Sequence, residues 1–425
     1  MAENGQTAKD LITTLARLAL RSFLDTGCSL QCAPASPPRV SVVMLLCNRA
    51  ELTLTAVQSL LTSAQKVPLE LIFVDNGSTD ETGLLLERLE GIKAILNNFN
   101  VGFPAGVNQG ARLATGEFVL LLNNDTQVLG DSIGVGVSYL DANPDVGAVG
   151  GRIILLDGTL QEAGCSLFVD GWTVQQGRGR PPDDPAFSFQ RDVDYCSGAF
   201  LLTRRASFWE LGGLDETFSP GYFEDADYGM RVWEAGRRVV YLPDIAVLHY
   251  ENATSSVLHH IPDLVGRNHA LFAGKHAAWL PARLPRAGWS LLAARSAPDV
   301  ATRVLLVADG FFGGRSVNGA ATLAQVAHHL LDRDAFLTLC HTRACRDHLV
   351  SVLRSLPRTA EVLPCESLEE IGRVMDTRRS YYDLLIAGDA AAKPVMLPQP
   401  ACGPVHAVWT SGRLAPWRPG SGCHD

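Results

Sequence analysis

Basic residues are in the minority in this chain of 425 residues, where 36 Lys and Arg stand against 45 Asp and Glu. Binding to nucleic acid needs clustered Lys and Arg, because the phosphate charge must be neutralised. The formal net charge of -9 therefore argues against nucleic acid as the main partner. Long apolar runs are also missing, since none approaches the roughly 20 residues that cross a bilayer. With 47% hydrophobic and 19% charged residues, the composition is that of an ordinary globular protein.

The sequence also lacks a disulfide framework. Its ten cysteines are scattered, and several lie inside apolar runs, which is typical of reduced core thiols in the cytosol. Two pairs, Cys28 with Cys32 and Cys340 with Cys345, have neither the spacing nor the neighbouring ligands of a zinc site. The cysteines within apolar runs include Cys47, Cys196 and Cys340.

The first residues show no secretion signal, since no basic cluster precedes an apolar core and Arg17 and Arg21 interrupt the segment 11–24. Apolar residues in this segment have helical spacing, with Arg on the other side. Such a helix can lie on a membrane surface or pack against a domain, and packing is the commoner outcome. We expect a cytoplasmic protein, with the inner face of the cell membrane as a second option.

Four parts follow one another along the chain. Residues 1–38 read as an N-terminal helix and a proline-rich linker, and residues 259–299 as a helical, proline-punctuated connector. In residues 39–258, short apolar runs alternate with helical patterns, which predicts an α/β domain with a mostly parallel sheet and helices on both faces. Residues 300–425 resume this alternation for about half of a doubly wound domain, and their tail has no periodicity. We therefore expect a partial Rossmann-like domain, with the chain truncated relative to a longer parent.

The composition and the spacing of apolar residues predict one long loop and the following strands and helices. Residues 171–190, rich in Gly, Pro, Arg and Asp, are expected to form a mobile loop. The predicted strands are 40–46, 69–74, 94–96, 118–122, 196–203, 238–242, 303–308, 336–339, 361–363 and 383–387. The predicted helices are 52–61, 82–89, 105–113, 206–211, 223–235, 320–331, 346–353 and 368–374.

Acidic side chains come directly after two of the predicted strands. Asp75 follows the apolar run 69–74, and Asp125 comes shortly after 118–122. In open α/β sheets, ligands bind at the carboxyl ends of the strands. Further along, Glu224-Asp225 opens a helix. The order suits a metal-bound nucleotide diphosphate with a separate carboxylate base beside it.

Residues 40–256 resemble the family-2 inverting glycosyltransferases with the GT-A fold, and they are most similar to the rhamnosyltransferase-like branch that builds bacterial surface polysaccharides. The resemblance rests on short motifs that occur in order, none of them decisive alone. These motifs are Asn48-Arg49-Ala50-Glu51-Leu52, Val74-Asp75-Asn76-Gly77-Ser78-Thr79-Asp80, Asn100-Val101-Gly102-Phe103, Gly106-Val107-Asn108-Gln109-Gly110, Leu121-Leu122-Asn123-Asn124-Asp125-Thr126, Ser197-Gly198-Ala199-Phe200, Leu211-Gly212-Gly213-Leu214-Asp215-Glu216, Glu224-Asp225-Ala226-Asp227 with Arg231, and His249. The half-domain from residue 300 faintly resembles the front half of a GT-B glycosyltransferase, and we expect no independent activity there.

The resemblance assigns a role to each of these groups of acidic residues. It implies that Asp125 and His249 bind a divalent metal, and that Asp225, with Glu224 beside it, is the catalytic base. Carboxylate and imidazole together suit Mn²⁺ better than a strictly oxygen-seeking ion, so Mn²⁺ or Mg²⁺ is the expected cofactor. The residues expected to contact the nucleotide or donor sugar are Asp75, Asn76, Asn48, Gly102, Asn108, Asn124, Gly198 and Ala199.

A plain structural role stands beside each of these assignments. The residues from Asp75 to Asp80 favour a helix cap, a role that we predict for Asp80 itself. The turn around Asp125 could be only an Asn/Asp turn, and acids such as Asp225 favour any helix N-terminus. Asp227 and Arg231, one helical turn apart, predict a structural ion pair.

Three positions depart from the family pattern. Asn123 stands where the family often has the first Asp of Asp-x-Asp, which removes one anionic metal ligand. Leu45 and Cys47 stand where relatives often have Pro or Thr and Tyr, so the choice of nucleotide base stays open.

Taken together, these features predict transfer of a sugar from a UDP- or dTDP-sugar to a glycan or lipid-linked acceptor, by single displacement with inversion. Two other classes stay open. A nucleotidyltransferase would want a basic, Gly-rich phosphate loop, whereas residues 48–51 supply one cation. A non-catalytic glycan-binding or scaffold protein could retain the same fold, since fold alone does not guarantee function.

Overall fold

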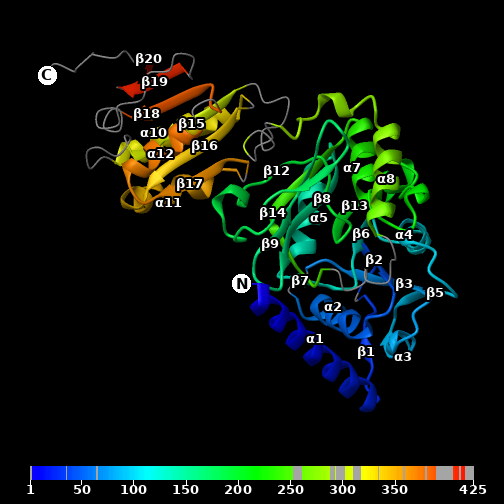
Figure 1. Cartoon of the computed structure of the whole chain (residues 1–425). Helices are drawn as coiled ribbons and strands as arrows, with labels where there is room; N and C mark the ends of the chain where they lie inside the picture. Colours follow the sequence, from blue (N-terminus) through cyan, green and yellow to red (C-terminus); the bar gives the residue numbers. More distant parts are fainter. Residues whose placement is uncertain are drawn as a thin grey trace. The chain divides into compact units, whose positions relative to one another are not determined.

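The structure is a computed structural model in which the chain forms two compact units. The first comprises Met1–Pro182 and Asp192–Trp289, and the second Asp183–Arg191 and Ser290–Asp425 (Figure 1). The structure describes residues 2–34, 36–63, 66–251, 261–287, 292, 302–309, 317–333, 335–357, 359–378, 381–388, 405–410 and 413–416.

The first unit is built on one mixed sheet, whose strands run in the order β14-β8-β13-β6-β2-β3-β5, with β7 on β14 and β9 on β8. The pairs β2/β3, β3/β5, β2/β6 and β8/β14 are parallel, and β13 is antiparallel to both of its neighbours. The α/β class with a mostly parallel sheet is thus confirmed. The strand bounds are β2 Val40–Leu46, β3 Leu69–Asn76, β5 Lys93–Asn97, β6 Phe118–Leu122, β7 Thr126–Leu129, β8 Val146–Leu155, β9 Leu160–Ala163, β13 Phe200–Arg204 and β14 Arg238–His249.

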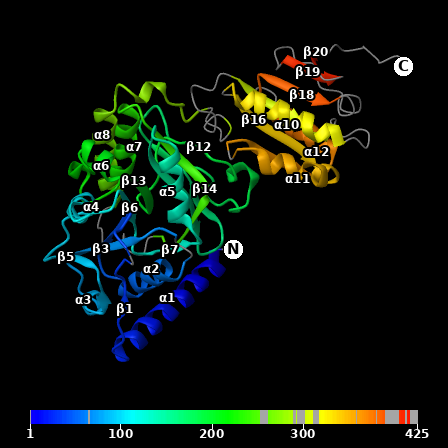
Figure 2. The same cartoon turned by 180° about the vertical axis from the view of Figure 1, so that it is seen from behind.

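Helices cover both faces of this sheet because its strands are apolar on both sides. Val42 and Met44 join one core cluster with side chains of α2 and α5, and α5 packs along β14 and β8 (Figure 2). Val43 faces α4 on the opposite side, where a Cβ on Gly110 would approach its side chain to 2.6 Å. Only glycine therefore lets α4 come this close to β2. The helix bounds are α2 Ala50–Thr62, α3 Thr82–Leu86, α4 Phe103–Arg112, α5 Ser132–Ala142, α6 Arg205–Glu210 and α7 Glu224–Glu234.

The N-terminal helix α1 (Ala2–Asp25) packs against α2, as expected, through the buried Ala16 and Leu20. Its outer face exposes Leu11, Leu15 and Leu18. Within the described residues, no helix has the length and apolar character needed to span a membrane.

Two predictions about the middle of the chain are wrong. Part of the expected mobile loop 171–190 is a hairpin, in which β11 (Thr173–Gln175) pairs with β10 (Cys165–Leu167). The strand expected to end at residue 242 continues to His249, because Pro243 sits where the pairing of β14 shifts register, between Tyr241 and Ala246. Proline is tolerated at such an irregularity, so here it does not end the strand.

The segment expected as a connector contributes α8 (Ile261–Lys275) to the first unit. Shorter elements complete the two units: β1 Leu30–Gln31, which pairs with β4 Leu89–Glu90, and η1 Pro185–Phe187, β12 Arg191–Asp192, η2 Glu216–Phe218, η4 Leu280–Ala282 and η6 Arg343–Cys345.

The second unit contains a sheet with the order β17-β16-β15-β18-β19-β20, parallel except for β20. This is the doubly wound order, in which the chain reverses direction across the sheet beside its first strand. The tail expected to be irregular supplies β19 and β20, so the sheet is larger than the predicted half-domain. The bounds are β15 Arg303–Val307, α10 Val317–Leu331, β16 Phe336–Thr342, α11 Arg346–Ser355, β17 Glu361–Cys365, α12 Leu368–Thr377, β18 Leu384–Gly388, β19 Val405–Thr410 and β20 Arg413–Pro416.

Candidate active site

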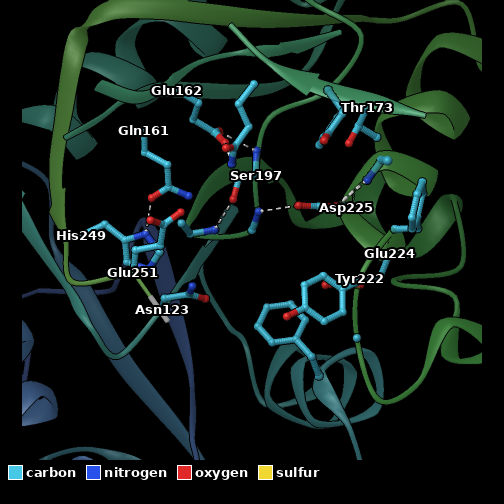
Figure 3. A pocket seen from close by; sticks show the side chains of 18 of the residues that line it. Asn123, Gln161, Glu162, Thr173, Ser197, Tyr222, Glu224, Asp225, His249 and Glu251 are labelled. Carbon is cyan, nitrogen blue, oxygen red and sulfur yellow. Dashed lines mark hydrogen bonds between the residues drawn. The ribbon is translucent and has the colours of Figure 1, made fainter. Parts of the chain in front are cut away.

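A cavity of about 690 Å³ lies in the first unit at the carboxyl ends of β2, β3 and β6. A volume of this size is typical of a small-molecule site. Figure 3 shows its acidic side chains on two sides, with His249 and Glu251 facing Glu224 and Asp225. Further walls come from β9, from β11 and from the turn that precedes β13.

Asp125 and His249 meet at one end of this cavity. The Nε2 atom of His249 lies 3.1 Å from Oδ1 of Asp125, and its Nδ1–H donates to Oε1 of Gln161 at 2.6 Å. Both side chains are almost fully buried. Burial would raise the pKa of Asp125, but His249 lowers it below its ordinary value. Burial would lower the pKa of His249, but Asp125 raises it.

These two side chains fit a divalent cation. Because Nδ1–H of His249 is bound by Gln161, the lone pair of Nε2 in the neutral ring faces a carboxylate oxygen, an arrangement that needs a proton or a metal ion between them. The part of the chain that is described offers no group of three or more His, Cys, Asp or Glu for a metal. A protein that gives few ligands suits a Mg²⁺- or Mn²⁺-type ion completed by substrate phosphates and water.

Glu224 and Asp225 lie on the other side, at the start of α7. Asp225 accepts from the backbone N–H of Ala226 at 2.8 Å and of Gly198 at 3.3 Å. Burial raises the pKa of Asp225. Burial and the neighbouring Asp225 and Asp227 raise the pKa of Glu224 to about 8. The Oε2 atom of Glu224 is buried and has no hydrogen-bond partner among the residues that the structure describes.

The loop before Glu224 and Asp225 has a strained backbone, and α8 binds this loop through hydrogen bonds. Tyr222 and Phe223 have φ angles of 73° and 74°, which side chains other than glycine rarely adopt. The fully buried amide of Asn268 donates to the carbonyls of Phe218 and Gly221 at 2.8 Å and of Tyr222 at 3.0 Å. Strain of this kind persists only where the surroundings enforce it, and it is concentrated at functional sites.

Asp227, two residues after Asp225, has a structural role. It pairs with Arg231 at 2.8 Å, which confirms the predicted ion pair. Lys275, the last residue of α8, and His276, which follows it, also contact Asp227, at 2.6 and 2.8 Å. Burial would raise its pKa, but hydrogen bonds from these partners lower it. These contacts hold α7 in place next to α8.

Glu162, which the sequence analysis missed, is the most deeply buried of the carboxylates on this side. It lies on β9, is 2% exposed and lines the cavity. Its oxygens accept from Ser197 N–H at 3.3 Å, from Gln175 Nε2 at 3.2 Å and from the Cys165 thiol at 3.4 Å. Burial and the nearby Asp225 raise its pKa to about 7.

The cavity is strongly acidic. Among the described residues that line it, Arg178 is the only Lys or Arg, and Glu251 holds its guanidinium with two hydrogen bonds, at 2.8 and 2.9 Å. The lining carboxylates are Asp125, Glu162, Glu224, Asp225 and Glu251.

Four of the predicted donor-binding residues are not among the described residues that line the cavity. The carboxylate of Asp75 accepts from Ser78 N–H at 3.0 Å, and Asn48 accepts from Thr79 N–H at 2.7 Å, so both brace neighbouring loops. Asn108 bonds both backbone groups of Leu214. The fourth, Gly102, has φ +90° and would place a Cβ 2.3 Å from Ser219 Oγ.

The other predicted residues line the cavity: Asn76, Asn124, Gly198, Ala199, Glu224, Asp225, Asp125 and His249. The amides of Asn76 and Asn124 are engaged within the protein, the latter with the Asn48 carbonyl at 3.3 Å and Thr53 Oγ1 at 3.0 Å. Asp80 accepts from the N–H groups of Ala50 and Thr82, the first residues of α2 and α3, each at 3.0 Å, while Glu81 holds the N-cap position of α3.

The three departures from the family pattern, Leu45, Cys47 and Asn123, all line the cavity. The Sγ atom of Cys47 lies 3.8 Å from Nδ2 of Asn100, and the backbone N–H of Asn123 donates to the carbonyl of Ala199 at 3.3 Å. The positions that depart from the expected motif pattern therefore lie in the wall of the cavity.

Part of this chain is similar to known proteins. Residues 41–212 match the model of Glycosyl transferase family 2. The O-antigen biosynthesis protein RfbC of Myxococcus xanthus is 32% identical over 51% of this chain and 18% of its own length, so the chain spans less than a fifth of that relative. The N-acetylglucosaminyl-diphospho-decaprenol L-rhamnosyltransferase of Mycobacterium tuberculosis is 28% identical over 53% of this chain and 81% of its own length. A solved structure of GalNAc-T7 with UDP, GalNAc and Mn²⁺ covers 56% of this chain and 48% of its own, at 15% identity and a TM-score of 0.44.

The first unit is thus an α/β domain with an acidic ligand cavity at the carboxyl ends of its strands. The family match covers β2 to α6 and includes Asp125, Glu162 and Ser197, although it is shorter than half of the chain. Residues 41–212 are thus similar to the glycosyl transferase family 2 model, the family that the motifs resembled.

Proposed function

We propose that this chain is a metal-dependent glycosyltransferase that moves a sugar from a nucleoside diphosphate to a hydroxyl group, with inversion at the anomeric carbon. One observation carries the proposal: the pair Asp125 and His249 and the pair Glu224 and Asp225 line the same cavity. Sugar transfer needs two such groups of side chains, one beside the leaving diphosphate and one beside the incoming hydroxyl.

The acidity of the cavity supports the need for a metal. A diphosphate brings negative charge to a site in which Arg178, the one Lys or Arg among the described lining residues, is already paired with Glu251. Asp125 and His249 are the residues that would hold a Mn²⁺ or Mg²⁺ ion. When bound, the ion supplies positive charge beside the oxygens of the leaving diphosphate.

Asp225 is the proposed base. The acceptor hydroxyl gives its proton to Asp225, and its oxygen forms a bond to the anomeric carbon on the face opposite the diphosphate. The bond from that carbon to the phosphate oxygen breaks, and its electron pair leaves with the nucleoside diphosphate. A carboxylate with a raised pKa suits this step, because a base performs best when its pKa lies near the working pH.

Two relatives guide the choice of substrates. One is named for rhamnose transfer to a lipid-linked N-acetylglucosaminyl diphosphate, and the other for O-antigen synthesis. We therefore propose a UDP- or dTDP-sugar such as dTDP-rhamnose as donor, a glycan or lipid-linked acceptor, and a role in surface polysaccharide synthesis.

A panel of sugar nucleotides tests this proposal. The full chain is incubated with UDP-glucose, UDP-N-acetylglucosamine, dTDP-rhamnose and GDP-mannose, each with Mn²⁺, Mg²⁺ or EDTA, and release of the nucleoside diphosphate is measured. We expect release from a uridine or thymidine donor, lost with EDTA and in Asp125→Ala. No release from any donor, or release that is equal with EDTA, would contradict the proposal.

A further inference from the structure

The side of the cavity that contains Asp225 has a different set of lining residues from the side that contains Asp125 and His249. Its wall is formed by Glu162, by Trp172 and Gln175 of the β10–β11 hairpin segment, and by Tyr222 of the loop before α7. Figure 3 shows Glu162, Tyr222 and Asp225 around this side. The wall therefore combines a carboxylate and an amide with two aromatic rings.

We propose that this side is an acceptor subsite that takes an uncharged sugar ring, in which Glu162 accepts hydrogen bonds from sugar hydroxyls next to the one that Asp225 deprotonates. The inference rests on the proposed function and goes beyond it, because it names the class of acceptor and the side chain that selects it.

The turn before β13 sets the spacing of the two carboxylates. Ser197 N–H donates to Glu162 and the next amide, Gly198 N–H, donates to Asp225, at 3.3 Å each. Consecutive Cα atoms are about 3.8 Å apart, so the two carboxylates stand side by side on one short stretch of backbone. Adjacent hydroxyls of a single sugar ring can then meet adjacent carboxylates.

The hydrogen bonds that Glu162 accepts within the protein are weak, so it can accept others from such a ligand. The donors to Glu162 are an amide, a carboxamide and a thiol at 3.2 to 3.4 Å, all neutral. A buried carboxylate normally has stronger partners, such as Lys or Arg. The hydroxyls of a sugar would add further neutral donors to Glu162.

Aromatic side chains make this wall rigid. Trp172 is fixed by a stack on His269, with ring centroids 4.2 Å apart and planes 17° apart, by an edge contact with Phe223 at 6.2 Å, and by Arg286, which lies over its ring at 5.3 Å. A side chain held in this way costs little entropy to order on binding.

Charge then determines the class of acceptor. Glu162, Glu224 and Asp225 stand together, and the one guanidinium that lines the described cavity is paired with Glu251. A carboxylate on the acceptor would meet the ionised Asp225 beside two further carboxyl groups, and no unpaired Lys or Arg among these lining residues. We therefore infer that the subsite accepts neutral sugars and rejects uronic acids.

Saturation-transfer NMR with methyl glycosides tests the subsite without requiring turnover. The full chain with UDP or dTDP and Mn²⁺ is titrated with the methyl glycosides of glucose, galactose, mannose, rhamnose and N-acetylglucosamine, and with methyl glucuronide. We expect at least one neutral glycoside to bind at least about tenfold more tightly than the glucuronide. Equal binding of the glucuronide, or no binding by any neutral glycoside, would overturn the proposal.

Substitution of Glu162 completes the test. Glu162→Gln keeps the shape of the side chain, and we expect it to weaken glycoside binding at least about tenfold while Mn²⁺-dependent nucleotide binding is unchanged. Gln175→Ala, on a half-exposed strand, should act in the same direction, and Glu117→Gln, on the far surface in an ion pair with Arg39, should change nothing. Unchanged glycoside binding in both Glu162→Gln and Gln175→Ala overturns the subsite alone. A wild-type chain that binds no nucleotide overturns the proposed function and the subsite with it.

Discussion

Glu162 and Asp225 accept hydrogen bonds from consecutive backbone amides, those of Ser197 and Gly198, at 3.3 Å each. The two acids come from β9 and from the start of α7, more than sixty residues apart in sequence, and one turn sets their spacing. Figure 3 shows Ser197 between them. Loss of solvent contact raises the pKa of both carboxyls, and the nearby Asp225 raises that of Glu162 further.

The substitution Asp225→Asn removes the proposed base and leaves its size. We expect kcat to fall by about 10²- to 10⁴-fold, because that is the usual contribution of general-base catalysis. The affinity for nucleotide should stay within about twofold, since Asp225 stands on the acceptor side. Steady-state kinetics and nucleotide titration measure the two effects. A variant that retains kcat, or that loses nucleotide binding, would refute this role, and Glu117→Gln serves as the surface control.

The pH profile of transfer should rise from the acid side. The reaction needs ionised Asp225, whose pKa burial raises above 3.8. The rate is therefore low where this carboxyl is protonated and increases as pH rises through its pKa. Measurement of kcat from pH 4 to 8 checks the profile. A profile that is flat down to the pKa of an ordinary aspartate would show that Asp225 is not the titrating group.

Stability should have the opposite pH dependence, because of Glu162 and Glu224. Their folded-state pKa values are raised to about 7 and about 8, above the unfolded value of 4.5. Between the unfolded-state pKa of 4.5 and these raised values, the native state holds protons that the unfolded state has lost. The free energy of unfolding therefore falls as pH rises through this range. We expect Glu224→Gln to be more stable than wild type at pH 8 by at least about 1 kcal/mol. Urea unfolding at pH 5 and pH 8 measures this, and a variant destabilised equally at both would count against the buried, protonated carboxyl.

Gln161 should set the metal affinity through His249. It accepts from Nδ1–H and so directs the lone pair of Nε2 toward Asp125. Removal of such a partner usually costs about 10- to 100-fold in metal affinity. We expect Gln161→Ala to weaken Mn²⁺ binding in the presence of nucleotide by this factor, as followed by electron paramagnetic resonance. Gln58→Ala, exposed on α2, is the matched control, and equal affinity in both variants would refute the role of Gln161.

Asn268 should matter for both folding and catalysis. Its amide donates to three carbonyls of the strained loop before Glu224. Removing it leaves buried carbonyls without donors, at a cost of about 2 kcal/mol. We expect Asn268→Ala to lower kcat while nucleotide affinity is kept, because the loop carries the acceptor side. A stable variant with wild-type kcat would show that α8 does not position the base.

Much of the framework could be predicted from sequence. The buried strands of the first unit are continuous apolar runs, which identify themselves without long-range information. The positions of Asp125 and His249 came from motif order, and the structure brings them to 3.1 Å. Asp75 shows the limit of this reasoning: a residue at the end of a strand has the predicted location, but its side chain can bond the local turn instead of the cavity.

Other features could not be predicted because they depend on contacts between distant segments. Glu162 stands alone in a short strand, and only the fold brings Ser197 and Asp225 beside it. One signal was present: a carboxylate inside a strand that is otherwise buried needs a reason. Asn268 likewise gives no local pattern, since its three acceptors lie more than forty residues earlier in the chain.

The central claim is that one cavity holds the diphosphate at Asp125 and the acceptor at Asp225. Isothermal titration of wild type, Asp125→Ala and Asp225→Asn with UDP and dTDP, each with and without Mn²⁺, tests it most directly. We predict Mn²⁺-dependent binding to wild type and Asp225→Asn with similar affinity, and its loss in Asp125→Ala. Binding that is the same in all three proteins, or that does not depend on Mn²⁺, would contradict the account.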